Sequence, residues 1–134
     1  MSSFVKKLLR IERRIADEHG PFELFAAFRP DSDLRLWDLL VAAQWLESWS
    51  LNEIRVIASE LNREFTLPEL TKFSRIAIIE RDNPGLHALQ SAIQLEHGVR
   101  EFRNVTFFDV QILHAYIITC RHADTVEASP LYAT

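Results

Sequence analysis

The clearest pattern of hydrophobic and polar positions is in the segment 110–120, VQILHAYIITC. Alternate residues of a strand point to opposite faces of a sheet, and both alternating sets here are mostly apolar. One set is Val110, Ile112, His114, Tyr116, Ile118 and Cys120; the other is Gln111, Leu113, Ala115, Ile117 and Thr119. A strand that is apolar on both sides is covered on both faces. We therefore expect 110–120 to be an interior strand.

Four other segments have the features of helices. Over 3–19, apolar residues recur every three or four positions, and the Gly-Pro pair that follows is a typical helix end. Capping boxes, in which Ser or Thr is followed three residues later by Glu, begin at Ser50 and Thr66. An Asn-Pro pair at 83–84 also favours a helix start. We expect main helices over 3–19, 51–65 and 83–97, the last ended by Gly98, and a short helix over 66–73.

The remaining apolar segments lack a helical period and are rich in aromatic and β-branched residues. Segments 22–28 and 36–43 flank a Pro-Asp-Ser-Asp loop, which predicts a β-hairpin. Segment 75–80 predicts a single strand, and 100–108 predicts a second hairpin with 110–120. This order predicts an α+β fold with one mixed or antiparallel sheet of about five strands, packed by three main helices and one short helix. We expect one domain over 1–123 and a flexible tail over 124–134.

Composition then narrows the class of protein. The chain has 134 residues, of which 48% are hydrophobic, so one domain with a substantial core is expected. A formal net charge of −4 gives no broad positive field, and we expect no general nucleic-acid binding. The basic residues of the first helix are interleaved with acids, which is typical of a solvated face; they are Lys6, Lys7, Arg10, Arg13 and Arg14.

Cysteine and glycine usage exclude several kinds of site. Cys120 is the only cysteine, and the beginning of the chain lacks the apolar run of a secretory signal, which together favour the cytoplasm. No apolar run approaches the ~20 residues of a membrane span. Three glycines are too few for the usual phosphate-binding loops. His114 and Cys120 lie roughly 20 Å apart along a strand, too far to share one ion. We therefore expect no cofactor and no metal.

Asp38 is the first candidate for chemistry, because it lies within the apolar strand segment LWDLLV. A carboxylate there needs a partner or belongs to a site. One interpretation pairs it with Arg29 or Arg35 across the hairpin. The other combines it with Glu80 or Asp82 in an active site.

The second interpretation rests on a resemblance. A helix acid (Glu12 or Glu18), the hairpin Asp38 and the strand acid Glu80 resemble the metal-dependent nucleases of the restriction-endonuclease type. That family has a lysine two residues after the strand acid, where this chain has Asp82. The resemblance implies, as the alternative function, a metal-dependent hydrolase or nuclease-like enzyme that uses Asp38 with Glu80 or Asp82.

Three aromatic side chains are the other candidates. His114 lies among apolar residues and is either a hydrogen-bonded core histidine or a catalytic candidate. Trp45 and Trp49 lie between a strand and a capped helix. They either close over the core or serve as binding anchors for a partner.

The favoured function is a small cytoplasmic, non-enzymatic protein-interaction or regulatory protein. The predicted strands are apolar on both faces, and three main helices offer limited area to cover them. A homodimer that buries a sheet face or edge resolves this shortage. We therefore expect a second copy of the chain as partner, with another protein as the alternative, and no membrane.

Overall fold

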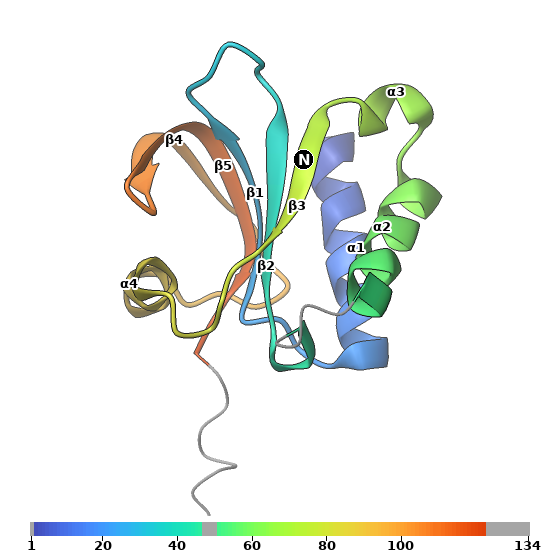
Figure 1. The fold of residues 1–134 in the computed structure, drawn as a ribbon, viewed down its shortest axis with the longest axis horizontal. Coiled ribbons are helices and arrows are strands. Elements are labelled where there is room, and N and C mark those ends of the chain that lie inside the picture. Colours follow the sequence, from blue (N-terminus) through green and yellow to red (C-terminus); the bar gives the residue numbers. More distant parts are fainter. Residues whose placement is uncertain (1, 47–50, 123–134) are drawn as a thin grey trace, which may run out of the picture.

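The computed structural model describes residues 2–46 and 51–122. Its centre is one five-stranded sheet in the order β3-β2-β1-β5-β4 (Figure 1). The strands are β1 Leu24–Pro30, β2 Trp37–Ala42, β3 Phe73–Ile78, β4 Arg100–Phe107 and β5 Val110–Cys120. β2 and β3 run parallel, and all other neighbours run antiparallel. The predicted α+β fold with one mixed sheet, two hairpins and one single strand is confirmed.

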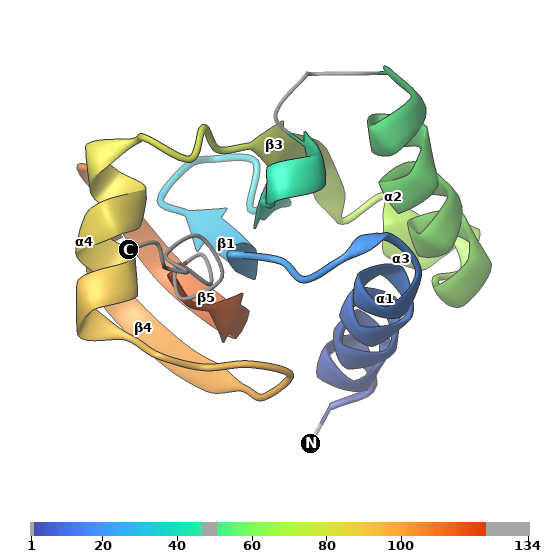
Figure 2. The same cartoon turned by 90° about the horizontal axis from the view of Figure 1, so that it is seen from below.

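Helices cover the two faces of the sheet unequally (Figures 1 and 2). The first face carries α1 Ser3–His19, α2 Leu51–Glu64 and the short α3 Leu67–Leu70, and the second carries α4 Pro84–Ala92. A one-turn 3-10 helix, η1 Gln44–Leu46, follows β2. The predicted capping box of α3 is confirmed, because Thr66 and Glu69 exchange both of its hydrogen bonds. The predicted cap at Ser50 and the predicted tail lie outside the described residues.

The third main helix is shorter than predicted. α4 ends at Ala92, and Ile93 already has an extended backbone (φ −129°, ψ 127°). Leu95 then pairs with Cys120 through two backbone hydrogen bonds of 2.9 and 2.8 Å. Strand-like pairing with β5 therefore replaces the last turn of the predicted helix, and Gly98 is not its end.

β5 is an interior strand, as predicted, but its side chains do not follow a strict alternation. The pairing of β1 with β5 shifts register near Phe25 and again near Arg29. Each shift moves the following side chains to the other face. As a result, Ile112 shares the α4 face with Ala115, and Ile118 packs on the α1 face. The two alternating sets predicted from the sequence are therefore wrong in detail.

The chain covers both faces of its own sheet. Buried apolar clusters lie on the α1 side and on the α4 side. The β4–β5 hairpin curls over the second face (Figure 1), so that the Phe107 ring centroid lies 5.3 Å from that of Phe28. The apolar strands therefore need no second subunit to cover a face.

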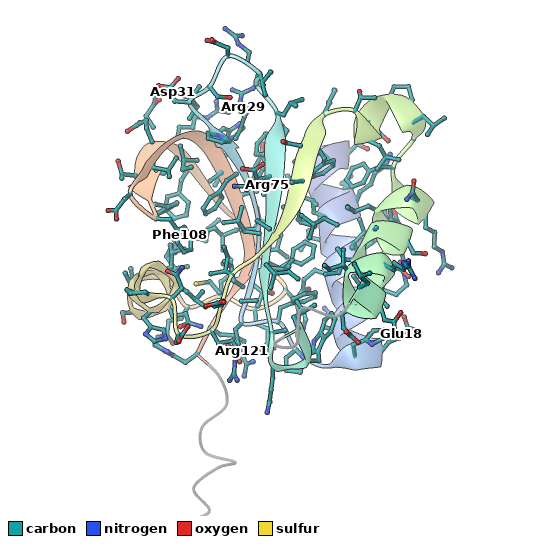
Figure 3. The ribbon with its side chains drawn as sticks, in the orientation of Figure 1. Glu18, Arg29, Asp31, Arg75, Phe108 and Arg121 are labelled. Carbon is teal, nitrogen blue, oxygen red and sulfur yellow. The ribbon has the colours of Figure 1, made fainter. Side chains whose placement is uncertain are left out.

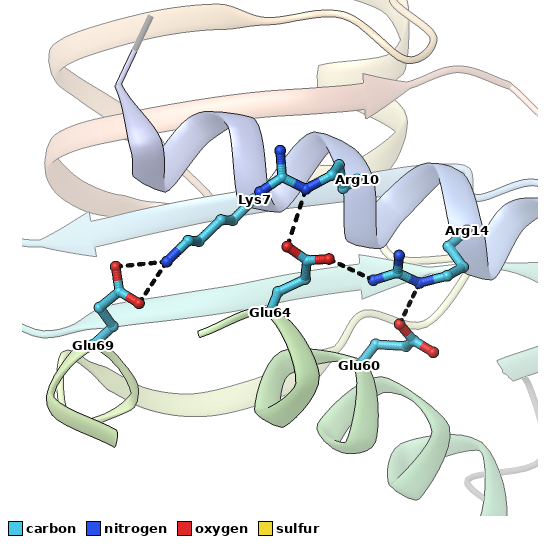
Figure 4. A network of polar contacts seen from close by, with 6 residues as sticks. All are labelled: Lys7, Arg10, Arg14, Glu60, Glu64 and Glu69. Atoms are coloured by element: carbon cyan, nitrogen blue, oxygen red, sulfur yellow. Dashed lines mark hydrogen bonds and ion pairs between the residues drawn. The ribbon is translucent and has the colours of Figure 1, made fainter. Parts of the chain in front are cut away.

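Ion pairs join α1 to α2 and α3 (Figure 4). Lys7 Nζ lies 2.7 Å from Glu69, and Arg14 binds both Glu60 and Glu64 at 2.6 and 2.8 Å. Arg10 also binds Glu64. The hydrogen bond from Lys7 lowers the pKa of the Glu69 carboxyl to about 2. Most of the basic face of α1 is therefore neutralised by acids of the same chain.

Candidate functional site

The candidate acids do not converge. Asp38 lies on β2 opposite Arg75 of β3, and Glu80 comes five residues after Arg75 along the chain. At ~3.3 Å per residue, Asp38 and Glu80 are about 16 Å apart, and Asp82 is further along. In the ranges 2–46 and 51–122, no three His, Cys, Asp or Glu side chains gather as a metal site. This separation does not favour the enzyme alternative, which stays a prediction.

Asp38 pairs with an arginine, although not with either of the predicted ones. Its Oδ1 lies 3.5 Å from Nε of Arg75. The partner comes from the parallel neighbour β3 and not from across the hairpin, so neither Arg29 nor Arg35 fills this role. The sequence does not tell which strand lies beside β2, and this decides the partner.

His114 is a hydrogen-bonded, nearly buried histidine. Its Nε2 lies 2.7 Å from a carboxylate oxygen of Glu101, and its ring centroid is 4.7 Å from that of Tyr116 and 5.2 Å from that of Trp37. The hydrogen bond from His114 is the main cause that lowers the pKa of Glu101. These contacts fit the structural interpretation, and a catalytic role for His114 stays a prediction.

Trp45 closes one end of the core on the α1 side. Its Nε1 donates to the Gly20 carbonyl at 3.0 Å, and its ring contacts those of Phe22 and His19. These contacts favour the interpretation that Trp45 closes over the core. The predicted binding role of Trp45 stays untested. Trp49 lies outside the described residues.

Sequence reasoning missed a buried polar network centred on Glu12. This carboxylate is fully buried; it lies 2.6 Å from Nδ1 of His97 and accepts a hydrogen bond from Thr119 Oγ1 at 2.7 Å. The backbone N–H of His97 also donates to Thr119. One signal was visible, because Glu12 falls on the apolar stripe of α1 between Leu8 and Ile15. Nothing local in the sequence points to His97.

The outer edge of β3 carries free backbone groups. The N–H of Ile79 donates to Val41 of β2 at 2.8 Å. Because backbone groups of a strand alternate in direction, Ile76 and Ile78 direct their N–H and C=O away from β2. Within 2–46 and 51–122, β3 is the last strand of the sheet on this side, so no described strand pairs with these groups.

The opposite edge of the sheet is protected. β4 carries the exposed charged residues Arg100, Glu101 and Arg103. Asn104 interrupts its extended backbone with a φ of 54°. Charges and local kinks are the usual features that prevent an edge strand from pairing with another chain. β3 has an arginine and a serine but also Ile76, Ala77 and Ile78 in succession, and it is the open edge.

A groove lies on the α4 face beside β3. Its cavity is about 280 Å³, and its walls come from β1, β2, β3 and the β4–β5 hairpin. Figure 3 shows Arg75 and Phe108 on the two sides of this region. The apolar lining is Phe28, Pro30, Leu40, Ala77, Ile79, Phe107, Phe108, Val110 and Ile112; the polar lining is Asp38, Arg75 and Asn83. The groove and the free edge make β3 the candidate binding region.

None of the helices in the described part of the chain is long and apolar enough to span a membrane.

Comparison with known proteins adds no function. No family model, no curated protein and no solved structure matches the chain.

Proposed function

We propose that this is a non-enzymatic cytoplasmic interaction protein that self-associates through the free edge of β3. The observation that carries the proposal is the outward direction of the backbone groups of Ile76 and Ile78 at an unprotected edge. A strand of a second copy that pairs there supplies hydrogen bonds to these groups and extends the sheet.

The charges around β3 favour a second copy in antiparallel orientation. Lys72 precedes the strand, whereas Glu80 and Asp82 follow it. Within the described ranges, none of these three side chains has an ion-pair partner. Antiparallel pairing of two copies brings the lysine of one near the acids of the other, whereas parallel pairing places like charges together.

Cys120 is consistent with a reducing compartment. It is fully buried, and burial raises the pKa of its thiol to about 11. A thiol with so little thiolate at neutral pH is poorly suited to disulfide exchange. The proposed cytoplasmic location rests on Cys120 being the single cysteine of the chain, which excludes a disulfide within it. The proposed absence of nucleic-acid binding rests on the neutralised face of α1.

The test is the mass in solution combined with a charge swap. Light scattering of the full chain is expected to give twice the monomer mass of 15.6 kDa at high concentration. Lys72→Glu is expected to raise the dimer dissociation constant about 5–30-fold, since exposed like charges replace opposite ones at two symmetric places. Adding Glu80→Lys and Asp82→Lys to Lys72→Glu restores the opposite charges and the affinity.

Arg13→Glu is the matched control, because it changes the same charge on the exposed surface of α1, away from β3. A wild-type chain that stays monomeric up to millimolar concentration contradicts the proposal. A dimer that is equally stable with Lys72→Glu also contradicts it, because β3 is then not the interface.

A further inference from the structure

The groove beside β3 contains one carboxylate that is only loosely paired. The Asp38 side chain is only 15% exposed, and its contact with Arg75, at 3.5 Å, is longer than a charged hydrogen bond of about 2.7–2.9 Å. Among the described residues, no backbone or side-chain group makes a hydrogen bond to this carboxylate. The carboxylate oxygens keep some contact with solvent in the groove, so they can accept a further donor without first losing a strong one. Asp38 is therefore suited to accept from a bound cation.

Arg75 is only loosely held beside the Asp38 carboxylate. Its side chain is 68% exposed, and among the described residues the contact with Asp38 is the only ion pair that it makes. By comparison, Arg81 holds the buried Glu23 with two contacts of 3.0 and 3.1 Å. Moving the Arg75 guanidinium into water therefore costs little free energy, and another cation can then bind Asp38.

The rest of the groove is apolar. Asn83 lines it, but its side-chain oxygen accepts from the backbone of Gly85 at 2.7 Å and caps α4. The other walls are aromatic and aliphatic, with Phe28 and Phe107 stacked at one side. A cavity of about 280 Å³ is near the lower end of the usual size of small-ligand sites. Its occupant therefore has one cationic group and an apolar body of modest size.

The wall formed by the β4–β5 hairpin contains two residues with an unfavourable backbone conformation. Phe108 and Asp109 both have a positive φ, 54° and 60°, which is unfavourable for a large side chain. Phe108 is accommodated because Gly85 has no Cβ; a Cβ there lies 2.5 Å from Cδ1 of Phe108. Packing against α4 thus keeps the aromatic wall over the groove and preforms the site.

We propose that this groove binds a primary amine with an apolar body, whose ammonium group donates to Asp38 while the body packs on Phe28, Phe107 and Phe108. The inference does not depend on self-association, because it rests on side chains of the α4 face and not on the strand edge. No covalent step is involved.

The test compares three probes of equal chain length: n-octylamine, n-octanol and octanoate. Calorimetric titration of the full chain at pH 7 is expected to show octylamine binding at least ten-fold tighter than octanol, and no binding of octanoate. Asp38→Asn keeps the shape of the side chain and is expected to remove the ten-fold preference for the amine. Arg75→Gln is expected to keep or strengthen amine binding, because it removes the competing cation.

Asp17→Asn is the matched control, since this exposed acid of α1 lies outside the groove, and it is expected to leave amine binding unchanged. Circular dichroism identifies any variant that does not fold. If octanoate binds best and Arg75→Gln abolishes its binding, Arg75 is the binding group and the proposal is overturned. If octylamine binds no better than octanol, or binds Asp38→Asn as well as wild type, the proposal is overturned too.

Discussion

Removing Glu12 tests whether the buried network fastens α1 to the end of β5. Glu12→Ala deletes a fully buried carboxylate and leaves Nδ1 of His97 and Oγ1 of Thr119 without the oxygens that now lie 2.6 and 2.7 Å away. His97 recovers part of this loss because its side chain is 27% exposed and reaches water. Thr119 is fully buried and does not.

The expected magnitude follows from these burials. Glu12→Ala removes the buried charge itself and leaves the buried Thr119 hydroxyl without its acceptor, which costs about 1–3 kcal/mol. Thr119→Val leaves the carboxylate with the His97 contact alone, and the loss of this one buried donor costs about 1–3 kcal/mol. The double variant is expected to be less destabilised than the sum of the two single variants by roughly 0.5–3 kcal/mol, because both remove the same contact.

Urea denaturation followed by far-UV circular dichroism measures the free energy of unfolding of the four proteins. The m value is the slope of the unfolding free energy against urea concentration. An unchanged m value confirms that the variants alter stability and not the surface exposed on unfolding. Ser91→Ala is the control, because this exposed residue of α4 lies outside the network and its replacement is expected to change little. If Glu12→Ala costs less than about 1 kcal/mol, or if the two losses simply add, the network does not fasten α1 as described.

Three further predictions concern other parts of the fold. Gly85→Ala is expected to destabilise by about 1–3 kcal/mol, because the new Cβ lies 2.5 Å from Phe108 and the hairpin has to move; a thermal melt measures the loss, and an unchanged melting temperature contradicts the predicted contact. Lys7 lowers the pKa of Glu69 to about 2, so this pair stabilises the fold above about pH 4.5 and loses that effect as the pH falls towards 2. Lys7→Met is expected to flatten the free energy of unfolding as a function of pH over this range. An identical profile for the variant and the wild type contradicts the prediction. Cys120, with a pKa raised to about 11 by burial, is expected to react with a thiol reagent at pH 8 only after unfolding, and rapid labelling of the folded chain excludes the described burial.

Local signals in the sequence predicted the elements better than their ends. The Thr66–Glu69 capping box needs only residues that are close in sequence, and it forms as predicted. The end of α4 is set by the pairing of Leu95 with Cys120, which lies far along the chain. The apparent stop signal at Gly98 therefore misplaced the end of this helix.

The candidate site was harder to predict for the same reason. The sequence identified Asp38 as an acid in an apolar strand that needs a partner. Its true neighbour, Arg75, becomes visible only once β3 is known to lie parallel to β2. The groove also depends on the curl of the β4–β5 hairpin and on the approach of Phe108 to Gly85, which no local pattern indicates.

Amide hydrogen exchange at Ile76 tests the proposed self-association most directly, because its N–H points to the open edge of β3. Ala77 is the internal control, since its N–H points to β2 in every copy. At high protein concentration Ile76 is expected to exchange nearly as slowly as Ala77, and dilution to the monomer is expected to make Ile76 exchange fast while Ala77 stays protected. Fast exchange at Ile76 in a solution shown to contain dimers contradicts the account.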